Sequence, residues 1–483
     1  MASGSAAPCG KRVGRLFARL RLEKVPLCVW KSADRWLEGL DGRTDIDILV
    51  AEDRVHEAHA IMVSEKWIPA IAEPWRRFDH LYDYLSFEDG RCLHIHLHTR
   101  IVAGEKMVKS LRPPLAEFYV EHIKDPLSYP PFVAPELEMV LFLLRTTLKI
   151  SLVDIAGAFR RGSARAVFRN YQAEFESLRE RCDPGCLEGF LQEKPLEFLP
   201  KTVMLNASRD IARLGWKERR ELRRHMKAWR VSNAWSHCLT FAWRASQKRW
   251  EGTGKLLPFP GISLAICGPD GSGKTTTVDA LQKHLSRHFR VSRFYMGSNM
   301  QHSDMLRGVV MKALWWPYLL LRKGCKVIGN SFGVRLLESA YNRLDQGFVH
   351  NQKRRRLERA DRATKAGQIV LFERFPLFYP FGDDSAKGLH GVSVTPNAPD
   401  LFVFLDVDPS LLLKRRGVDS ADILLRKQRE FRAYRCEQQS QNKRLLAMRG
   451  DAPLDDNVSE ILSALNELLS QRARSHLIKG TCM

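Results

Sequence analysis

The pattern of apolar and polar residues is most informative at residues 261–277, GISLAICGPDGSGKTTT. An apolar run from Ile262 to Cys267 predicts a buried parallel strand. A glycine-rich turn follows this run, and the amphipathic spacing that opens at residues 278–281 predicts a helix. This order of strand, glycine turn and helix predicts an α/β fold for the C-terminal half of the chain.

The same pattern continues toward the C-terminus. Residues 290–296 predict a second strand, 303–350 are mostly helical, and a long basic helix over 350–366 is ended by Gly367. Residues 368–372 predict a further strand that delivers Glu373 and Arg374 to its carboxyl end. In parallel α/β sheets, ligands bind at that end of the strands.

Strand periodicity also dominates the first part of the chain. Residues 25–30 predict a strand, Lys31 and Ser32 follow, and a second strand carries Asp45 and Asp47 on one face, where two carboxylates can share a divalent metal. Residues 91–98, RCLHIHLH, place three histidines on one face of another strand: His94, His96 and His98. Metal ligation by these histidines is one interpretation, and half-buried polar residues are the favoured one. Asp79 and Asp83 are nearby acids.

Helical periodicity takes over from residue 135 to about residue 250, and the Gly/Pro-rich stretch 251–261 predicts a linker. Residues 216–230 form a dense basic face, for which a solvated helix surface is favoured over nucleic-acid or lipid contact. Residues 313–321, ALWWPYLLL, are apolar between basic flanks. Burial in a core or a substrate pocket is favoured for them over a bilayer interface.

Composition narrows the class of protein. The chain has 483 residues, 44% hydrophobic and 27% charged, which is typical of a globular protein with two or three domains. A net charge of +22 favours a polyanionic partner: a phosphorylated substrate, a nucleic acid or an anionic membrane surface. Ten scattered cysteines indicate reduced thiols in a cytoplasmic protein. Because charges interrupt every long apolar run, we expect no transmembrane segment.

Residues 268–275, GPDGSGKT, match the Walker A pattern of two glycines five apart followed by Lys and Thr. Glycines allow successive backbone N–H groups to surround phosphate oxygens, and the following helix points its positive end at the same place. Lys274 is expected to reach the β- and γ-phosphates of ATP, and the Thr275 hydroxyl to ligate Mg²⁺. The expected nucleotide-binding residues are Gly268, Asp270, Gly271, Ser272, Gly273, Lys274, Thr275 and Thr276.

Four motifs in order give residues 261–470 a resemblance to thymidylate kinases. They are the P-loop with Asp270 before its second glycine, the basic helix ending at Gly367, the strand leading to Glu373-Arg374-Phe375, and the late strand 399–409 followed by a basic lid. The resemblance implies that Arg374 holds the acceptor's phosphate and that Arg415 or Arg416 closes over the transferring group. It implies that Glu373 orients Mg²⁺-bound water or the acceptor, and that Asp270 faces an acceptor hydroxyl. Further lid cations are Lys414, Arg426, Lys427 and Arg429.

The chain departs from thymidylate kinases on both sides of the acceptor site. The second strand ends in YMGSN where those enzymes have an Arg-Glu-Pro turn, and PLFYPFGDD follows Phe375 without the residues of a thymine pocket. The identity of the acceptor therefore stays open.

Residues 20–130 resemble the nucleotidyltransferase superfamily through Ser32 and the Asp45/Asp47 pair, although Lys31 stands where that family has glycine. The resemblance implies metal binding by Asp45 and Asp47. The third metal carboxylate of the family has no counterpart in 91–98, so a degenerate domain that binds substrate is favoured over one that transfers nucleotidyl groups.

These observations predict an α/β chain in which a three-layer P-loop parallel-sheet kinase domain follows a nucleotidyltransferase-like α+β domain and a helical domain. The predicted boundaries are 1–134, 135–250, a linker at 251–261, and 262–483. The predicted function is ATP- and Mg²⁺-dependent phosphoryl transfer to a small phosphorylated or hydroxylated acceptor. Three other functions stay open: sugar or glycan phosphorylation in surface-polysaccharide metabolism, nucleotidyl transfer by the N-terminal domain, and a nucleotide-gated binding module. A homodimeric state also stays open.

Overall fold

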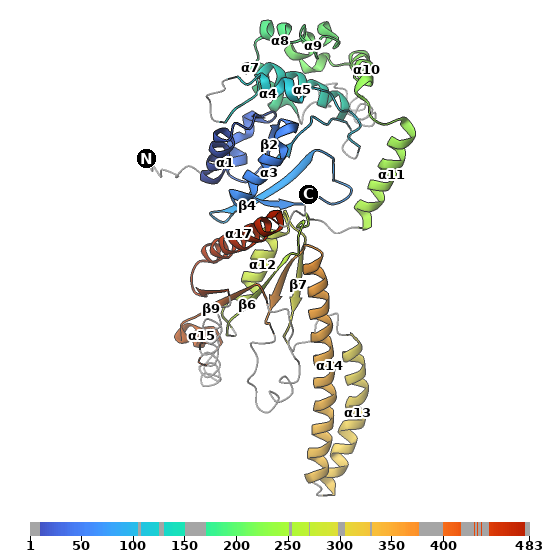
Figure 1. Ribbon diagram of the computed structural model, residues 1–483. Helices are drawn as coiled ribbons and strands as arrows, with labels where there is room; N and C mark the ends of the chain where they lie inside the picture. The colour runs from blue at the N-terminus through green and yellow to red at the C-terminus, as the bar shows by residue number, and fades with distance from the viewer. Residues whose placement is uncertain are drawn as a thin grey trace. The chain divides into compact units, whose positions relative to one another are not determined.

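Two compact units divide the chain in the computed structural model (Figure 1). The first unit comprises residues 1–258 and 462–483, and the second comprises residues 259–461. The structure describes residues 10–104, 108–124, 130–149, 171–250, 254–269, 271–297, 305–328, 331–375, 399–416, 429, 432, 436 and 444–478.

The first unit contains a five-stranded mixed sheet with the order β1-β2-β5-β4-β3. Its strands are β1 (Leu27–Val29), β2 (Ile46–Val50), β3 (Ile68–Ala70), β4 (Leu81–Glu88) and β5 (Arg91–His98). β5 lies parallel to β2, with Asp47 opposite His96, and antiparallel to β4, with Asp83 opposite His96. Because residues opposite each other share a face of the sheet, this register places Asp47, His96 and Asp83 in one row.

The first unit also contains ten described α-helices before residue 258. They are α1 (Lys11–Leu22), α2 (Trp36–Leu40), α3 (Val55–Ser64), α4 (Ala116–Glu121), α5 (Pro135–Lys149), α7 (Gln172–Arg181), α8 (Pro184–Phe190), α9 (Lys201–Arg209), α10 (Trp216–His225) and α11 (Ala234–Trp250). α5 is apolar around its whole circumference from Met139 to Leu144, a pattern typical of a buried helix.

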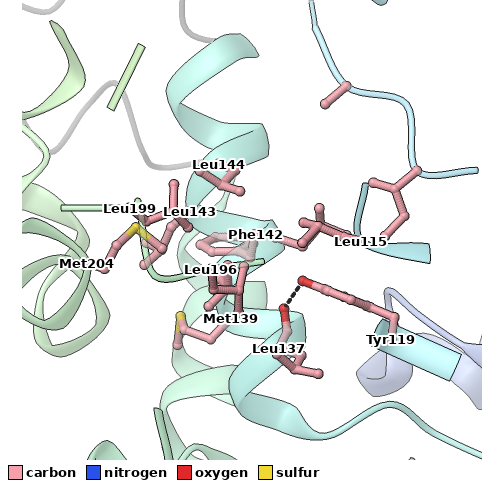
Figure 2. Close-up of a cluster of buried hydrophobic side chains, with 14 of the residues drawn as sticks. Leu115, Tyr119, Leu137, Met139, Phe142, Leu143, Leu144, Leu196, Leu199 and Met204 are labelled. Atoms are coloured by element: carbon pink, nitrogen blue, oxygen red, sulfur yellow. Dashed lines mark hydrogen bonds between the residues drawn. The ribbon is translucent and has the colours of Figure 1, made fainter. Parts of the chain in front are cut away.

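The core around α5 joins segments on both sides of the predicted boundary at residue 134 (Figure 2). Phe142 and its neighbours pack against Leu196, Leu199 and Met204, which follow α5 in the chain. Tyr119, which precedes α5, donates its hydroxyl hydrogen to the Leu137 carbonyl at 2.6 Å. The predicted domains 1–134 and 135–250 therefore share one core and one unit.

Removing the Phe142 ring should open a cavity in this core. We expect Phe142→Ala to lower the free energy of unfolding of the first unit by about 3–5 kcal/mol, because Phe142 is 1% exposed and its neighbours cannot fully collapse. Chemical denaturation followed by circular dichroism measures this. Leu37→Ala is the control, because Leu37 is 74% exposed and its loss should change stability by less than about 0.5 kcal/mol. Equal effects of the two substitutions would contradict the observed core.

The second unit contains a five-stranded parallel sheet with the order β10-β9-β6-β8-β7. Its strands are β6 (Ile262–Cys267), β7 (Val291–Tyr295), β8 (Ile369–Glu373), β9 (Leu401–Asp406) and β10 (Leu445–Arg449). Its helices are α12 (Lys274–Leu285), α13 (Met305–Val327), α14 (Ser331–Lys365) and α15 (Pro409–Arg416). The mixed α/β class with a parallel sheet is confirmed, and the P-loop strand β6 lies between β8 and β9.

Gly261 shows how closely the chain approaches this sheet. A Cβ atom at this position would lie 1.9 Å from the Gln368 carbonyl oxygen, so only glycine fits. Gly367 ends α14 as predicted and takes a φ of 79°, a left-handed conformation that favours glycine.

Two features of α13 and α14 differ from the prediction. The basic helix does not begin near residue 350, because α14 is one continuous helix from Ser331. Core burial of residues 313–321 is wrong for its largest side chains: Trp316 is 71% exposed, and Leu320 and Leu321 are also exposed. α13 packs on α14 through Tyr318 and Tyr341, whose rings stack with centroids 4.6 Å apart.

Helix α17 (Leu454–Ile478) is divided between the two units. Residues 462–483, which the sequence assigned to the P-loop domain, belong to the first unit. Asn466 explains this assignment, since its side-chain oxygen accepts hydrogen bonds from the Ser86 hydroxyl at 3.2 Å and the Phe87 amide at 2.9 Å. Across the described ranges, no helix has both the length and the apolar character needed to cross a membrane.

Candidate functional site

The P-loop connects β6 to α12 and requires glycine conformations. Gly271 and Gly273 both have φ of 90°, and α12 begins immediately afterwards at Lys274. A Cβ atom at Gly268 would lie 2.7 Å from the Leu405 carbonyl oxygen, which also requires glycine there. The loop therefore ends at a helix N-terminus whose backbone N–H groups can bind an anion.

Lys274 is buried within this loop and donates hydrogen bonds to the Gly268 carbonyl at 2.8 Å and the Pro269 carbonyl at 2.7 Å. An anion bound in the loop would stabilise this buried ammonium group. The Ser272 hydroxyl oxygen is buried and has no hydrogen-bond partner among the described residues. An unsatisfied hydroxyl and a buried cation in a glycine loop fit a bound phosphate group.

Glu373 connects the loop to the sheet. This carboxylate is 3% exposed at the carboxyl end of β8 and accepts a hydrogen bond from the Thr275 hydroxyl at 2.6 Å. Its second oxygen accepts from Arg293 at 2.5 Å, and the other end of that guanidinium pairs with Asp279. The predicted metal residues Thr275 and Glu373 are thus brought together. Arg293 could not be predicted as a site residue, because its place in β7 looks like that of any strand residue.

Arg374 follows Glu373 and leaves the strand with a φ of 62°. A non-glycine residue in this left-handed region carries strain of about 1–3 kcal/mol, and such strain clusters at functional sites. The guanidinium carbon lies 5.8 Å from the centroid of the Tyr295 ring at the end of β7. Arg374 is half-buried at the carboxyl edge of the sheet.

The other predicted residues of this site are only partly described. Asp270, Arg426 and Lys427 lie outside the described residues, as do the side chains of Arg415 and Arg416 at the end of α15. Thr276 is exposed in the first turn of α12. Arg432, which the sequence analysis did not identify, contacts both oxygens of Asp406 at the end of β9 at 3.1–3.2 Å.

A second cluster of functional groups lies on the sheet of the first unit. The predicted residues Asp45, Asp47, His94, His96 and His98 come together there, and Asp83 joins them from β4. Lys31 lies 2.8 Å from Asp47, and Lys255 lies 3.6 Å from Asp83. The sequence showed that Asp83 is a nearby acid but not which face of the sheet it occupies. Only the register of β4 against β5 shows that face.

Burial and charge shift the pKa values of this cluster in opposite directions. Burial alone would raise the pKa of Asp47, but Lys31, His96 and His98 lower it well below its ordinary value. Burial would lower the pKa of His96, but Asp47 and Asp83 raise it to about 9. Burial has the largest effect on the pKa of His98 and lowers it to about 3. The carboxylates are thus ionised at neutral pH.

The basic face of residues 216–230 lines a cavity of about 420 Å³ in the first unit. The prediction of a solvated helix surface is wrong for Arg219, which is 4% exposed and donates to the Thr147 carbonyl at 3.0 Å. Arg223 donates to the same carbonyl at 3.2 Å. Contact of this face with an anionic partner stays a prediction.

Comparison with known proteins agrees with the P-loop site. No family model matches the chain. A thymidylate kinase of Clostridium novyi (strain NT) is 26% identical over 166 residues, which cover 32% of this chain and 70% of that enzyme. The chain therefore contains a region similar to P-loop nucleotide kinases.

A structural comparison gives a weaker likeness. The comparison aligns this chain with the structure of deoxyadenosine kinase from M. mycoides with bound dATP. The aligned region covers 43% of this chain and 100% of that kinase, with 14% sequence identity and a TM-score of 0.23. A TM-score this low means that the two chains superpose poorly, so this likeness supports no conclusion about the fold.

Proposed function

We propose that the second unit is an ATP- and Mg²⁺-dependent phosphotransferase of the thymidylate kinase type, which transfers the γ-phosphoryl group of ATP to a small acceptor. The observation that carries this proposal is the hydrogen bond between the P-loop hydroxyl of Thr275 and the buried Glu373 carboxylate. This pair places a hydroxyl and a carboxylate, both ligands suited to Mg²⁺, beside a loop suited to phosphate.

Phosphoryl transfer depends mainly on positioning and charge neutralisation. Backbone N–H groups of the P-loop and the Ser272 hydroxyl would bind phosphate oxygens, and Lys274 would exchange its two carbonyl partners for them. Thr275 and Glu373 would hold Mg²⁺, directly or through water, and the ion would neutralise phosphate charge. Arg293 orients Glu373 through their ion pair.

Arg374 is the proposed ligand of the acceptor. We expect Arg374→Ala to lower kcat/KM for the acceptor on the order of 10- to 100-fold, because one charge-assisted contact is lost, while the KM for ATP changes little. Steady-state kinetics with each substrate varied in turn measures this. Arg287→Ala is the control, because Arg287 is an exposed arginine of the same unit. An equal rise in KM for ATP and acceptor would contradict the assigned role.

The acceptor is tested by a panel. Thymidylate, other nucleoside monophosphates and sugars are each incubated with ATP and Mg²⁺, and ADP and phosphorylated products are measured. The proposal predicts that at least one acceptor is phosphorylated in stoichiometric amounts with ADP. A sugar product with inert nucleotides would replace the thymidylate kinase type with a sugar or glycan kinase. Tight ATP binding without ADP under any acceptor would instead favour a nucleotide-gated binding module.

Nucleotidyl transfer by the first unit has a separate readout. It requires release of pyrophosphate, which should disappear in Asp45→Ala while ADP formation by the second unit persists. The Lys274→Ala variant should show the reverse pattern, so the two activities are distinguishable in one chain.

A further inference from the structure

We propose that the first unit binds a divalent transition-metal ion through Asp45, His94 and His96. These three side chains come from the start of β2 and from β5, and one ligand atom of each lies within 4.8 Å of the other two. Two imidazoles and one carboxylate form a ligand set that zinc and related ions commonly use. The site is distinct from the P-loop, and it shares only Asp45 with the two-carboxylate site predicted from the sequence.

The separations between the ligand atoms suit such an ion. Two donors bound at about 2.1 Å in tetrahedral geometry lie about 3.4 Å apart. The Asp45 Oδ1 lies 2.5 Å from His94 Nδ1, and its Oδ2 lies 3.8 Å from His96 Nε2. His96 Nε2 also lies 3.2 Å from Asp83 Oδ1, so an ion bound between Asp45 and His96 would replace that contact.

The second nitrogen of each ligand imidazole is held by a buried carboxylate. His94 Nε2 lies 2.8 Å from Asp83, and His96 Nδ1 lies 3.2 Å from Asp47. Histidines that bind metals usually donate their other N–H to a carboxylate, which fixes the orientation of the ring and makes the ligand nitrogen more basic. Asp47 and Asp83 are thus positioning residues, which explains two buried carboxylates behind the site.

Ligand atoms of Asp47, His96 and His98 also lie within 4.8 Å of one another. However, Lys31 lies 2.8 Å from Asp47 Oδ1, the same atom that His96 and His98 contact. A cation already neutralises that oxygen, so a metal there would face a lysine ammonium. The Asp45 side chain is 46% exposed and leaves the first set open toward solvent, which gives an ion a path of entry.

The imidazole ligands determine which class of metal ion the site prefers. Nitrogen donors favour Zn²⁺ and the later transition metals such as Co²⁺ and Ni²⁺, whereas Mg²⁺ prefers oxygen donors and retains its water. The cluster can also remain intact without metal if His96 is protonated, since its contacts with Asp47 and Asp83 are then ion pairs. Metal binding must therefore be measured directly.

The test uses the full chain, stripped with a chelator and titrated with Zn²⁺, Co²⁺ and Mg²⁺ by calorimetry. We expect one Zn²⁺ per chain, bound on the order of 100-fold or more tightly than Mg²⁺. Bound Co²⁺ should show the visible absorption bands of nitrogen and oxygen coordination. Asp45→Asn is isosteric and half exposed, so it should fold and yet weaken Zn²⁺ binding on the order of 100-fold.

Two further variants separate ligand, positioning and unrelated residues. Asp83→Asn should weaken Zn²⁺ about 10- to 100-fold without changing the stoichiometry. His98→Gln is the matched control on the same strand and should keep the wild-type affinity. The proposal is overturned if the stripped protein binds no Zn²⁺, if Mg²⁺ binds as tightly, or if Asp45→Asn binds like the wild type. A loss in His98→Gln equal to that in Asp45→Asn would also contradict it.

Independently, we infer that α13 docks on an anionic membrane surface. Val309, Trp316, Leu320 and Val327 are all at least 65% exposed. Their spacings of 7, 4 and 7 residues place them in one stripe of the helix, on the side opposite Tyr318, which packs on α14. α13 carries five basic and no acidic residues, and Lys312 and Lys323 flank the stripe.

This arrangement fits lipid better than a second copy of the chain. Large apolar side chains with tryptophan beside basic residues are typical of helices that lie in the interface of an anionic bilayer. A second copy would bring the same cations together, because the chain carries a net charge of +22. Charge complementarity therefore favours the anionic surface.

Vesicle co-sedimentation of the full chain tests this docking. We expect binding to vesicles that contain phosphatidylglycerol, weaker binding at high salt, and little binding to phosphatidylcholine alone. The double variant Trp316→Ser/Leu320→Ser should lose on the order of 10-fold or more in affinity. Val231→Ser/Leu239→Ser, which alters exposed apolar residues of the first unit, is the control. Equal binding of both variants, equal binding to neutral vesicles, or self-association that the double variant abolishes would each overturn the inference.

Discussion

Lys274→Ala should lower ATP turnover on the order of 100- to 1,000-fold, the usual effect of removing one group that stabilises charge in a transition state. In the structure this ammonium is buried and donates hydrogen bonds to the carbonyl oxygens of Gly268 and Pro269. An approaching phosphate would offer it a charged partner. The substitution removes the cation without deleting any of the loop's backbone N–H groups, so weak nucleotide binding should persist.

The measurement compares turnover and equilibrium binding of ATP for the wild type and the variant. Lys283→Ala serves as the matched control, because Lys283 is an exposed lysine of the same helix. Both variants should unfold at the same temperature as the wild type. Wild-type turnover in Lys274→Ala would contradict the P-loop assignment.

Glu373→Gln should have the second-largest effect, on the order of 10- to 100-fold in turnover, with a higher Mg²⁺ concentration needed for half-maximal activity. The substitution preserves shape but removes the charge that faces Thr275 and Arg293. An amide can accept one hydrogen bond from Thr275, but it holds a divalent ion less tightly than a carboxylate.

Asp279→Asn separates this effect from a general disturbance of Arg293. It removes the other carboxylate that Arg293 contacts and leaves the bond between Thr275 and Glu373 in place. We expect nearly unchanged activity and an unchanged Mg²⁺ requirement. A shift in the Mg²⁺ requirement as large as that of Glu373→Gln would mean that Glu373 acts only through Arg293.

The parallel sheet of the second unit could be predicted from the sequence because its signals are local. The apolar run of β6, the glycine turn and the opening of α12 are contiguous, and each follows from residue type alone. Thr275 was predicted as a metal residue from the P-loop motif, and Glu373 from the resemblance to thymidylate kinases. Their direct contact depends on β8 lying next to β6, which sequence patterns do not show.

The partners of the clustered histidines could not be predicted from local sequence patterns. Alternation shows that His94, His96 and His98 share a face, but the pairing of β5 with β2 and β4 decides which carboxylates they meet. Lys31 stands where glycine was expected and pairs with Asp47. That pairing makes Asp47 a poorer metal ligand than its alternation with Asp45 suggested.

The exposure of α13 could not be predicted either. Its apolar content is typical of a core helix, and burial depends on which surfaces face it. α14 covers one side, through Tyr341, and leaves the stripe with Trp316 in solvent. The apolar pattern predicted a helix correctly and its surroundings wrongly.

The most direct test of the account follows the γ-phosphate of labelled ATP in the purified full chain with Mg²⁺ and the acceptor panel. The account predicts that the label moves to at least one acceptor and that ADP forms in equal amount. It predicts that Lys274→Ala lowers the rates of both on the order of 100- to 1,000-fold, whereas Lys283→Ala leaves them unchanged. A wild-type protein that transfers no label and releases no ADP under any of these conditions would contradict it, whether or not it binds ATP.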